Sequence, residues 1–254
     1  MANLFNLDSK VALITGSSQG IGLALAKGLA QHGARIILNG RDSSKLKQAA
    51  KELAKHSEKI DLLPFDVTDE EQINRVLSNY QQESCGIDIL INNAGIQYRK
   101  PLEEYPSDKF EHLIKTNVQS IFYVSKAVVG RMINQNAGKI INIASVQAAL
   151  ARPGIAPYTT TKGAVSNLTK GMAADWAKFG IQCNAIAPGY FDTPLNEALV
   201  KDDSFSKWLI ERTPAGRWGK VEELVGVCIF LSSKASSFVN GQTIYVDGGI
   251  TATI

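Results

Sequence analysis

Three polar side chains in one short stretch of the sequence carry proton-transfer chemistry. Tyr158 and Lys162 are four positions apart, a spacing that puts both on one face of a helix, and Ser145 lies shortly before them. Oxidising a secondary alcohol requires a base that takes the hydroxyl proton while hydride leaves the carbon. A free tyrosine has a pKa of about 10, too high for this task near neutral pH, and a nearby ammonium lowers that pKa. The three residues predict an alcohol/carbonyl site with Tyr158 as the acid or base.

The elements around these residues favour that interpretation. The apolar run 139–144 is typical of a buried strand, and Ser145 follows it directly. Pro157 suits the first turn of a helix over 158–179. Open α/β sheets bind ligands at the carboxyl ends of their strands. Because any helix can carry a Tyr–Lys pair, this placement carries more weight than the pair itself.

A glycine-rich loop follows the first predicted strand, 11–15. Gly16, Gly20 and Gly22 occur where this strand would turn into a helix over 21–31. A pyrophosphate must approach backbone N–H groups at a helix N-terminus, and side chains at these positions would block it. The spacing differs from the common G-x-G-x-x-G, but the position between strand and helix predicts a dinucleotide site.

Two other motifs compete for this loop. Residues 16–20 also fit the G-x-S-x-G turn of serine hydrolases, which requires a histidine late in the chain. The histidines here are His32, His56 and His112, all early. No Gly-Lys-Ser/Thr follows the loop, which excludes a P-loop. So few histidines leave no pattern for a zinc site, and we expect neither a hydrolase nor a bound metal.

The end of the second predicted strand, 35–38, indicates which dinucleotide binds. NAD-binding folds place an acid about 20 residues beyond the glycines, where it binds the ribose 2′-hydroxyl. This chain has Asn39 and Arg41 there instead. An arginine fork matches a 2′-phosphate, and Ser17 or Ser18 offers a further hydroxyl. The pattern favours NADP (NADPH), with NAD accepted less well.

Apolar strand patterns alternate with helical ones along the whole chain. The predicted strands are 11–15, 35–38, 62–65, 87–91, 139–144, 181–187 and 242–246. The predicted helices are 21–31, 43–56, 69–83, 110–133, 158–179 and 221–231. Continuous apolar strands joined by crossover helices are typical of a parallel sheet covered on both faces. We predict a single Rossmann-like α/β domain over 1–254, a doubly wound parallel sheet of about seven strands.

One segment, 190–220, departs from this alternation. It contains Pro194, Pro214 and two tryptophans. We predict a small helical insertion that acts as a substrate lid, and the alternative is a hairpin that only packs on the surface.

Composition excludes several classes of protein. The chain has 254 residues, 44% hydrophobic and 20% charged, which excludes disordered and fibrous proteins. Lys and Arg number 27 against 24 Asp and Glu, and they are scattered, so we expect no nucleic-acid or membrane partner. Cys85, Cys183 and Cys228 are widely spaced, which indicates a reducing compartment. The short segment before the first strand does not fit a signal peptide, and we expect a cytoplasmic protein.

The motifs taken together resemble the short-chain dehydrogenase/reductase family over nearly the whole chain. They are TGSSQGIG (15–22), Asp66-Val67, NNAG (92–95), Asn117, Ser145, YTTTK (158–162) and PG (188–189). The resemblance implies that Tyr158 is the base in oxidation and the acid in reduction, with Ser145 orienting the reacting oxygen. It implies that Lys162 binds the nicotinamide ribose and that Asn117 holds a water of a proton relay.

The resemblance also implies the contacts of the cofactor. Asp66 and Val67 would contact adenine, and Phe191 stands where the family usually has an aliphatic residue. The implied cofactor-binding residues, with Arg41, are Gly16, Ser17, Ser18, Gln19, Gly20, Ile21, Gly22, Asn39, Asp66, Val67, Asn93, Ala94, Gly95, Tyr158, Lys162, Pro188, Gly189, Phe191 and Thr193.

Longer segments resemble the gluconate 5-dehydrogenase group of this family. They are NNAGIQYRKP (92–101), SVQAALARPGIAPY (145–158), APGYFDTPLNEALV (187–200), RTPAGRWG (212–219) and FLSSKASSFVNGQTIYVDGG (230–249). The resemblance implies interconversion of D-gluconate and 5-dehydro-D-gluconate (5-ketogluconate) with NADP(H) or NAD(H). Family members usually form tetramers through the helices carrying Asn117 and Tyr158 and through the C-terminal strand, so a homotetramer is also implied.

A sugar acid requires partners for a carboxylate and several hydroxyls. Arg99, Gln147 and Arg152 follow the strand ends that carry NNAG and Ser145. We predict that Arg99 binds the carboxylate, since an arginine fork matches it in a bidentate manner. The predicted substrate-binding residues are Arg99, Ser145, Gln147, Arg152 and Tyr158. Two alternatives stay open, a reductase of another carbonyl, such as another sugar acid or a β-ketoacyl thioester, and a catalytically silent NADP-binding protein.

Overall fold

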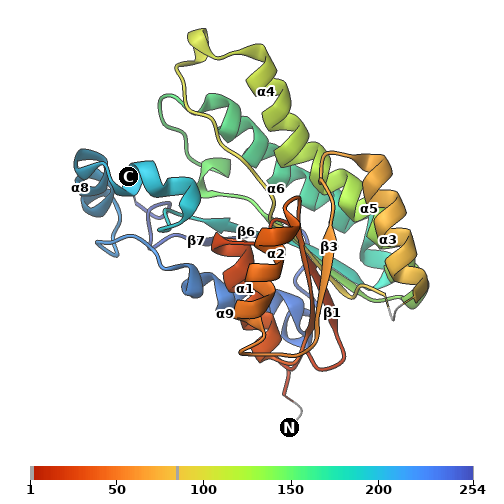
Figure 1. Cartoon of the computed structure of the whole chain (residues 1–254). Helices are drawn as coiled ribbons and strands as arrows, with labels where there is room; N and C mark the ends of the chain where they lie inside the picture. Colours follow the sequence, from red (N-terminus) through yellow and green to blue (C-terminus); the bar gives the residue numbers. More distant parts are fainter. Residues whose placement is uncertain (1–2, 84–85, 254) are drawn as a thin grey trace.

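The structure, a computed structural model, describes residues 3–83 and 86–253. Its centre is a seven-stranded parallel sheet in the order β3-β2-β1-β4-β5-β6-β7 (Figure 1). The strands are β1 (Val11–Ile14), β2 (Arg35–Gly40), β3 (Ile60–Pro64), β4 (Ile89–Asn92), β5 (Gly138–Ile143), β6 (Ile181–Pro188) and β7 (Thr243–Val246). The predicted doubly wound α/β fold is confirmed.

Helices cover both faces of this sheet. They are α1 (Gly20–Gln31), α2 (Ser43–Leu53), α3 (Glu70–Glu83), α4 (Ser107–Ile114), α5 (Ser120–Gln135), α6 (Ala156–Trp176), α7 (Glu197–Val200), α8 (Asp203–Arg212) and α9 (Val225–Ser232). Strand order reverses between β1 and β4, which pair side by side. Loops leave these strands toward opposite sides, and ligands of such sheets bind in the crevice that opens there.

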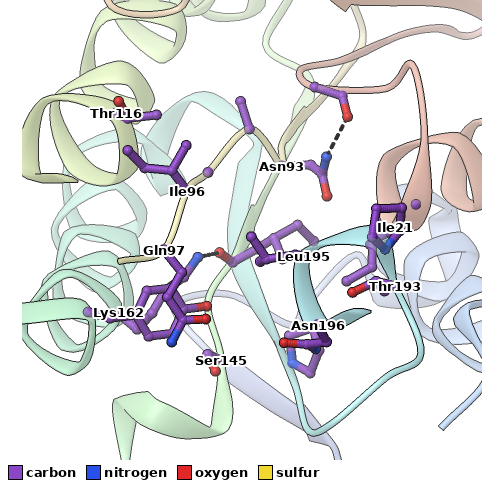
Figure 2. Close-up of a pocket in the computed structure, with 18 of the residues that line it drawn as sticks. Ile21, Asn93, Ile96, Gln97, Thr116, Ser145, Lys162, Thr193, Leu195 and Asn196 are labelled. Atoms are coloured by element: carbon purple, nitrogen blue, oxygen red, sulfur yellow. Dashed lines mark hydrogen bonds between the residues drawn. The ribbon is translucent and has the colours of Figure 1, made fainter. Parts of the chain in front are cut away.

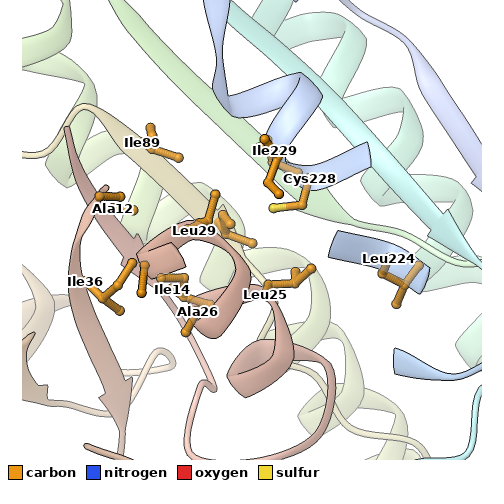
Figure 3. Close-up of a cluster of buried hydrophobic side chains, with 14 of the residues drawn as sticks. Ala12, Ile14, Leu25, Ala26, Leu29, Ile36, Ile89, Leu224, Cys228 and Ile229 are labelled. Carbon is orange, nitrogen blue, oxygen red and sulfur yellow. The ribbon is translucent and has the colours of Figure 1, made fainter. Parts of the chain in front are cut away.

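Alternate residues of each central strand enter two separate cores. Ala12 and Ile14 of β1 pack with α1, α2 and α9, as Figure 3 shows for Leu25 and Cys228. Val11 and Leu13 face the other way and pack with α3, α5 and α6. Because both faces are buried, β1 is apolar at every position and the other central strands are largely so. The buried amides of Asn92 and Asn142 are exceptions, and they hydrogen-bond to each other.

The helix predicted over 110–133 is interrupted. A π-helical turn, Lys115–Gln119, joins α4 to α5. A π-turn inserts one residue into the helical repeat and re-aims the side chains around it, and such turns occur often at functional sites. Asn117 lies on this turn and is 1% exposed.

The segment 190–220 is helical, as predicted. It contains the 3₁₀ turn Pro194–Asn196, then α7 and α8. Phe205 of α8 and Trp218 pack with Tyr190, which anchors the segment to the end of β6.

The cysteines and the absence of a predicted membrane span can be compared with the structure. Cys85 lies outside the described residues, and Cys183 and Cys228 are free and buried. Among the helices of the described ranges, none is both long and apolar enough to span a membrane.

Candidate active site

A pocket of about 510 Å³ lies along the carboxyl ends of the strands. The loops after β1, β4, β5 and β6 all contribute to its walls. Figure 2 shows Ser145 and Lys162 on one side of it, with Thr193 and Asn196 facing them. The volume is within the range usual for small-molecule and cofactor sites.

The three predicted catalytic residues meet in this pocket. Ser145 caps the 3₁₀ turn after β5, and its hydroxyl also hydrogen-bonds with the phenol of Tyr158. Nζ of Lys162 lies 5.6 Å from the centre of the Tyr158 ring and donates to the carbonyl of Ile143 at 2.7 Å. The helix α6 thus presents the phenol and the amine to the end of β5, as the four-residue spacing predicted.

Burial is the largest influence on the pKa values of both Tyr158 and Lys162. It raises the pKa of Tyr158 to about 12, against the lowering effects of the Ser145 hydroxyl and the Arg99 charge. Burial also lowers the pKa of Lys162 to about 8. The lowering of the phenol pKa that the sequence argument attributes to Lys162 and the positive nicotinamide together stays a prediction. Desolvation of the phenolate outweighs the neighbouring charges.

Asn117 supports the loop after β4. Its Oδ1 accepts from the backbone N–H of Ile96 at 2.8 Å, and its Nδ2 donates to the Ile96 carbonyl at 2.9 Å. Nδ2 also lies 3.3 Å from Oγ1 of Thr161, the neighbour of Lys162. The amide therefore ties the π-turn to both the pocket loop and the catalytic helix. Its water-holding role stays a prediction.

The glycine loop forms a close-fitting cradle. A Cβ on Gly22 would lie 2.6 Å from both Nδ2 of Asn93 and the carbonyl oxygen of Gly16. Gly16 and Gly20 have φ of +62° and +57°, values that favour glycine. Backbone N–H groups at the start of α1 are thus left accessible beside the pocket, which fits a pyrophosphate.

Two residues predicted to touch the cofactor have other partners. The Ser17 hydroxyl is fully buried, donates to the Ile14 carbonyl at 2.8 Å and accepts from the backbone of Asn39. The Asn39 amide donates to the carbonyls of Leu63 and Phe65. Both side chains join β1, β2 and β3. Asn39 still lines the pocket, and of the two serines predicted to offer a hydroxyl, Ser18 lines it and Ser17 does not.

Arg41 and Asp66 close the far end of the pocket. The two side chains pair at 3.6 Å, and Arg41 is 72% exposed. Burial alone would raise the pKa of Asp66, but hydrogen bonds from Thr68 and the Arg41 charge bring that pKa below its usual value. An exposed guanidinium in the pocket lining is suited to a 2′-phosphate.

Most of the other predicted cofactor residues also line the pocket. They are Gly16, Gln19, Gly20, Ile21, Val67, Asn93, Ala94, Gly95, Pro188, Gly189, Phe191 and Thr193. Phe191 pairs its backbone with Gly219 and is 4% exposed. Its aromatic ring packs into the core and against Gly219. Gly22 is not among the lining residues, and its lack of a side chain leaves room for Nδ2 of Asn93, which donates to the carbonyl of Gly16 at 3.0 Å. Figure 2 shows Asn93 among the side chains that line the pocket.

The predicted substrate residues gather beyond Tyr158. Arg99, Gln147 and Arg152 all line the pocket. Burial, followed by the charge of Arg152, lowers the pKa of Arg99. Nε of Arg99 and Nε of Arg152 are buried without a hydrogen-bond partner, and within the described ranges no carboxylate pairs with either guanidinium. Two neighbouring cations with unused donors fit an anionic ligand.

Sequence reasoning missed two residues of this region. Tyr190 lies against Gln147, and Oδ1 of Asn196 lies 3.4 Å from Arg99. Tyr190 directly follows the Pro188-Gly189 motif, which was a usable signal. Asn196 carried none, because the turn that brings it to Arg99 forms only through tertiary packing.

Comparisons with known proteins agree with this geometry. The family model described as enoyl-(acyl carrier protein) reductase matches residues 16–251. The chain belongs to the short-chain dehydrogenase/reductase family. A gluconate 5-dehydrogenase of Gluconobacter oxydans is 55% identical over 252 residues, 99% of this chain and 98% of that protein. The 5-keto-D-gluconate 5-reductase of Escherichia coli is 45% identical over the full length of both chains.

A solved structure of the same short-chain dehydrogenase/reductase family is also close. The gluconate 5-dehydrogenase of Burkholderia cenocepacia, in complex with NADP and tartrate, has a TM-score of 0.96 and 52% identity. The match covers 99% of this chain and 98% of that one. The likeness therefore extends over the sheet, the pocket loops and the segment 190–220 together.

Proposed function

We propose that this chain interconverts D-gluconate and 5-dehydro-D-gluconate with NADP(H). The observation that carries the proposal is that Arg99 and Arg152 line the pocket with unpaired N–H donors. They lie in the same pocket as the catalytic group of Ser145, Tyr158 and Lys162. The full-length likeness to gluconate 5-dehydrogenases supports the same substrate. An acyl-thioester substrate has an apolar chain and would leave both guanidinium groups unpaired.

The residues have separate roles in this reaction. Ser145 donates a hydrogen bond to the reacting oxygen, and Tyr158 takes the hydroxyl proton in oxidation or returns it in reduction. Lys162 holds the ribose next to the reacting centre. NADP(H), held by the glycine loop and Arg41, would supply the hydride acceptor or donor, and the positive charge of its oxidised form would favour the phenolate of Tyr158.

NADP rather than NAD is favoured by the ribose end of the pocket. Arg41 follows Gly40, the position where some family members keep an acid, and Ser18 lines the same pocket. The glycine cradle around Gly22 accepts the pyrophosphate common to both dinucleotides.

A substrate panel tests the proposal. We expect the enzyme to reduce 5-dehydro-D-gluconate with NADPH far faster than a β-ketoacyl thioester, and to favour NADPH over NADH. Arg99→Ala should weaken gluconate turnover and leave an uncharged polyol nearly unaffected. Faster reduction of the thioester, or no effect of Arg99→Ala on gluconate, would contradict the proposed substrate.

We also propose that 190–220 is a lid over the substrate and that the enzyme is a homotetramer. Arg152 stacks over Phe205 of α8 at 5.2 Å, which joins the insertion to the substrate loop. The edge strand β7 and the neighbouring face of α6 offer Tyr245 and the small residue Gly171 to a second copy. The cytoplasmic location stays a prediction from the sequence.

A further inference from the structure

A second phenol lies beside the catalytic one. Tyr190, at the end of β6, accepts a hydrogen bond through its hydroxyl from Nε2 of Gln147 at 3.3 Å. The Gln147 backbone N–H donates to the Ser145 hydroxyl at 3.2 Å. Tyr190 and Gln147 both line the pocket. Tyr190 and Gln147 therefore lie next to the Ser145 hydroxyl, the proposed partner of the reacting oxygen.

This pair has unused hydrogen-bonding capacity. Gln147 is 6% exposed, and its Oε1 is buried without a partner. Because the Tyr190 oxygen accepts from the amide, its own proton is available to a ligand. The pair thus offers one acceptor and one donor, side by side. The opposite orientation of the Gln147 amide would also leave one donor and one acceptor, so the conclusion does not depend on that assignment.

Only some ligand groups complement such a pair. A hydroxyl donates and accepts at once, so it can satisfy Gln147 and Tyr190 together. A carboxylate has no proton to donate, and a methylene group satisfies neither atom. Leaving a buried carbonyl unpaired costs free energy, which makes the pair selective against a ligand that lacks the hydroxyl.

The insertion holds the phenol in place. The Tyr190 ring packs on Phe205 at 5.7 Å and edge-on against Trp218 at 6.0 Å, measured between ring centres. Trp218 in turn donates to the hydroxyl of Ser206 at 3.2 Å. Phe205 of α8 and Trp218 therefore hold the ring in position.

We propose that Tyr190 and Gln147 bind a hydroxyl on a carbon adjacent to the reacting carbon, and so select polyhydroxy acids over their deoxy analogues. The inference rests on the proposed function and adds a specificity-determining pair to it. In D-gluconate the carbons that flank C5 are C4 and C6, and each carries a hydroxyl.

The test compares kcat/KM for D-gluconate with that for 4-deoxy- and 6-deoxy-D-gluconate. We expect the wild type to favour gluconate over one of the two analogues by about 10- to 100-fold. Tyr190→Phe and Gln147→Met should each reduce this ratio by about fivefold or more, mainly by slowing gluconate. NADPH affinity, measured by fluorescence titration, should stay unchanged and shows that the variants are folded.

Tyr105→Phe is the matched control, since it removes a phenol oxygen outside the pocket lining. It should retain the wild-type ratio. The proposed role of Tyr190 and Gln147 would be overturned if the wild type had equal kcat/KM for gluconate and both deoxy analogues. It would also be overturned if the Tyr190 and Gln147 variants kept the wild-type ratio of these values. In either case gluconate turnover would still support the proposed function. A wild type that does not turn over gluconate would instead overturn the proposed function, and the inference with it.

Discussion

At the scale of single residues, burial sets the chemistry of the pocket. Tyr158 and Lys162 are both enclosed at the end of β5, where the phenolate and the ammonium are poorly solvated. Burial favours the neutral form of each group, so the pKa of Tyr158 is raised and the pKa of Lys162 is lowered. The protonation of Tyr158 and Lys162 is therefore sensitive to any charge that a bound cofactor or substrate brings into the pocket.

Removing the phenol oxygen tests the acid–base role. Tyr158→Phe keeps the ring but deletes the atom that exchanges the proton. We expect kcat to fall by about 10²–10⁴, the share usual for general acid–base catalysis. Steady-state kinetics with NADPH measure this loss. Near-normal turnover in the variant would refute the role.

Removing the ribose-end cation tests the choice of cofactor. Arg41→Ala deletes the guanidinium that pairs with Asp66 and stands at the predicted 2′-phosphate position. We expect the KM for NADP to rise by about tenfold or more, with little change for NAD, because one charge-assisted contact is lost. An equal effect on both cofactors would remove the 2′-phosphate argument.

The lowered pKa of Lys162 has a consequence for stability. Its pKa of about 8 in the folded chain lies below the ordinary lysine value of 10.5, so the unfolded chain binds more protons between these limits. The destabilising contribution of Lys162 is therefore full below pH 8 and is relieved as pH rises toward 10.5. Relative to Lys162→Met, the wild type should gain about 2–3 kcal/mol of unfolding free energy between pH 7 and pH 10.

Urea unfolding of both proteins at the two pH values measures this gain. Lys47→Met, at an exposed position of α2, serves as the control and should show no such gain. A pH-independent difference between the wild type and Lys162→Met would show that the amine is not desolvated in the folded chain.

At the scale of elements, local chain geometry builds the site. The β1–α1 loop turns sharply through two glycines of positive φ, and the π-turn between α4 and α5 aims Asn117 at Ile96. The loop after β5 is held by Ser145, which caps the turn that follows. Ser145 and Asn117 therefore lie where a strand ends or a helix deviates from its regular repeat, whereas Tyr158 and Lys162 lie on the regular helix α6.

Crowding at the glycine loop yields a test at this scale. In Gly22→Ala, the new Cβ would meet Asn93 and Gly16 within 2.6 Å. We expect a loss of about 1–3 kcal/mol in unfolding free energy and weaker NADP binding, because the loop must shift. Gly130→Ala in α5 is the control, since nothing lies within 4 Å of its added Cβ. Tight NADP binding by Gly22→Ala would show that the cradle tolerates the shift.

At the scale of the whole molecule, the sheet is covered on its faces but ends in an exposed edge. The terminal strand β7 has no neighbour beyond it within the described part of the chain, and Tyr245 on it is 37% exposed. An unprotected edge strand invites pairing with another chain, and assembly is one way to cover it. The proposed tetramer would bury this edge together with α6.

A charge at this edge tests the assembly. We expect the wild type to sediment as a species of four times the 27.5 kDa chain mass. Tyr245→Glu should shift the protein to smaller species, because a buried and unpaired carboxylate is costly at an interface. Leu4→Glu, at a residue that is 53% exposed and remote from β7 in sequence, should leave the mass unchanged. A monomeric wild type would contradict the tetramer directly.

The sequence alone determined the layered fold and the catalytic face of α6. Strands that are buried on both sides are predominantly apolar, and a spacing of four residues on a helix needs no tertiary contact to align two side chains. The glycine loop was recognisable for the same reason, since positive φ and close backbone approach are local demands.

Only the tertiary structure decided which polar groups face the ligand. Ser17 turned inward because neighbouring strands offered its hydroxyl buried partners, and Tyr190 met Gln147 across 43 positions of sequence. Hydrogen-bond partners of this kind are chosen by packing between elements, which the order of residues does not display.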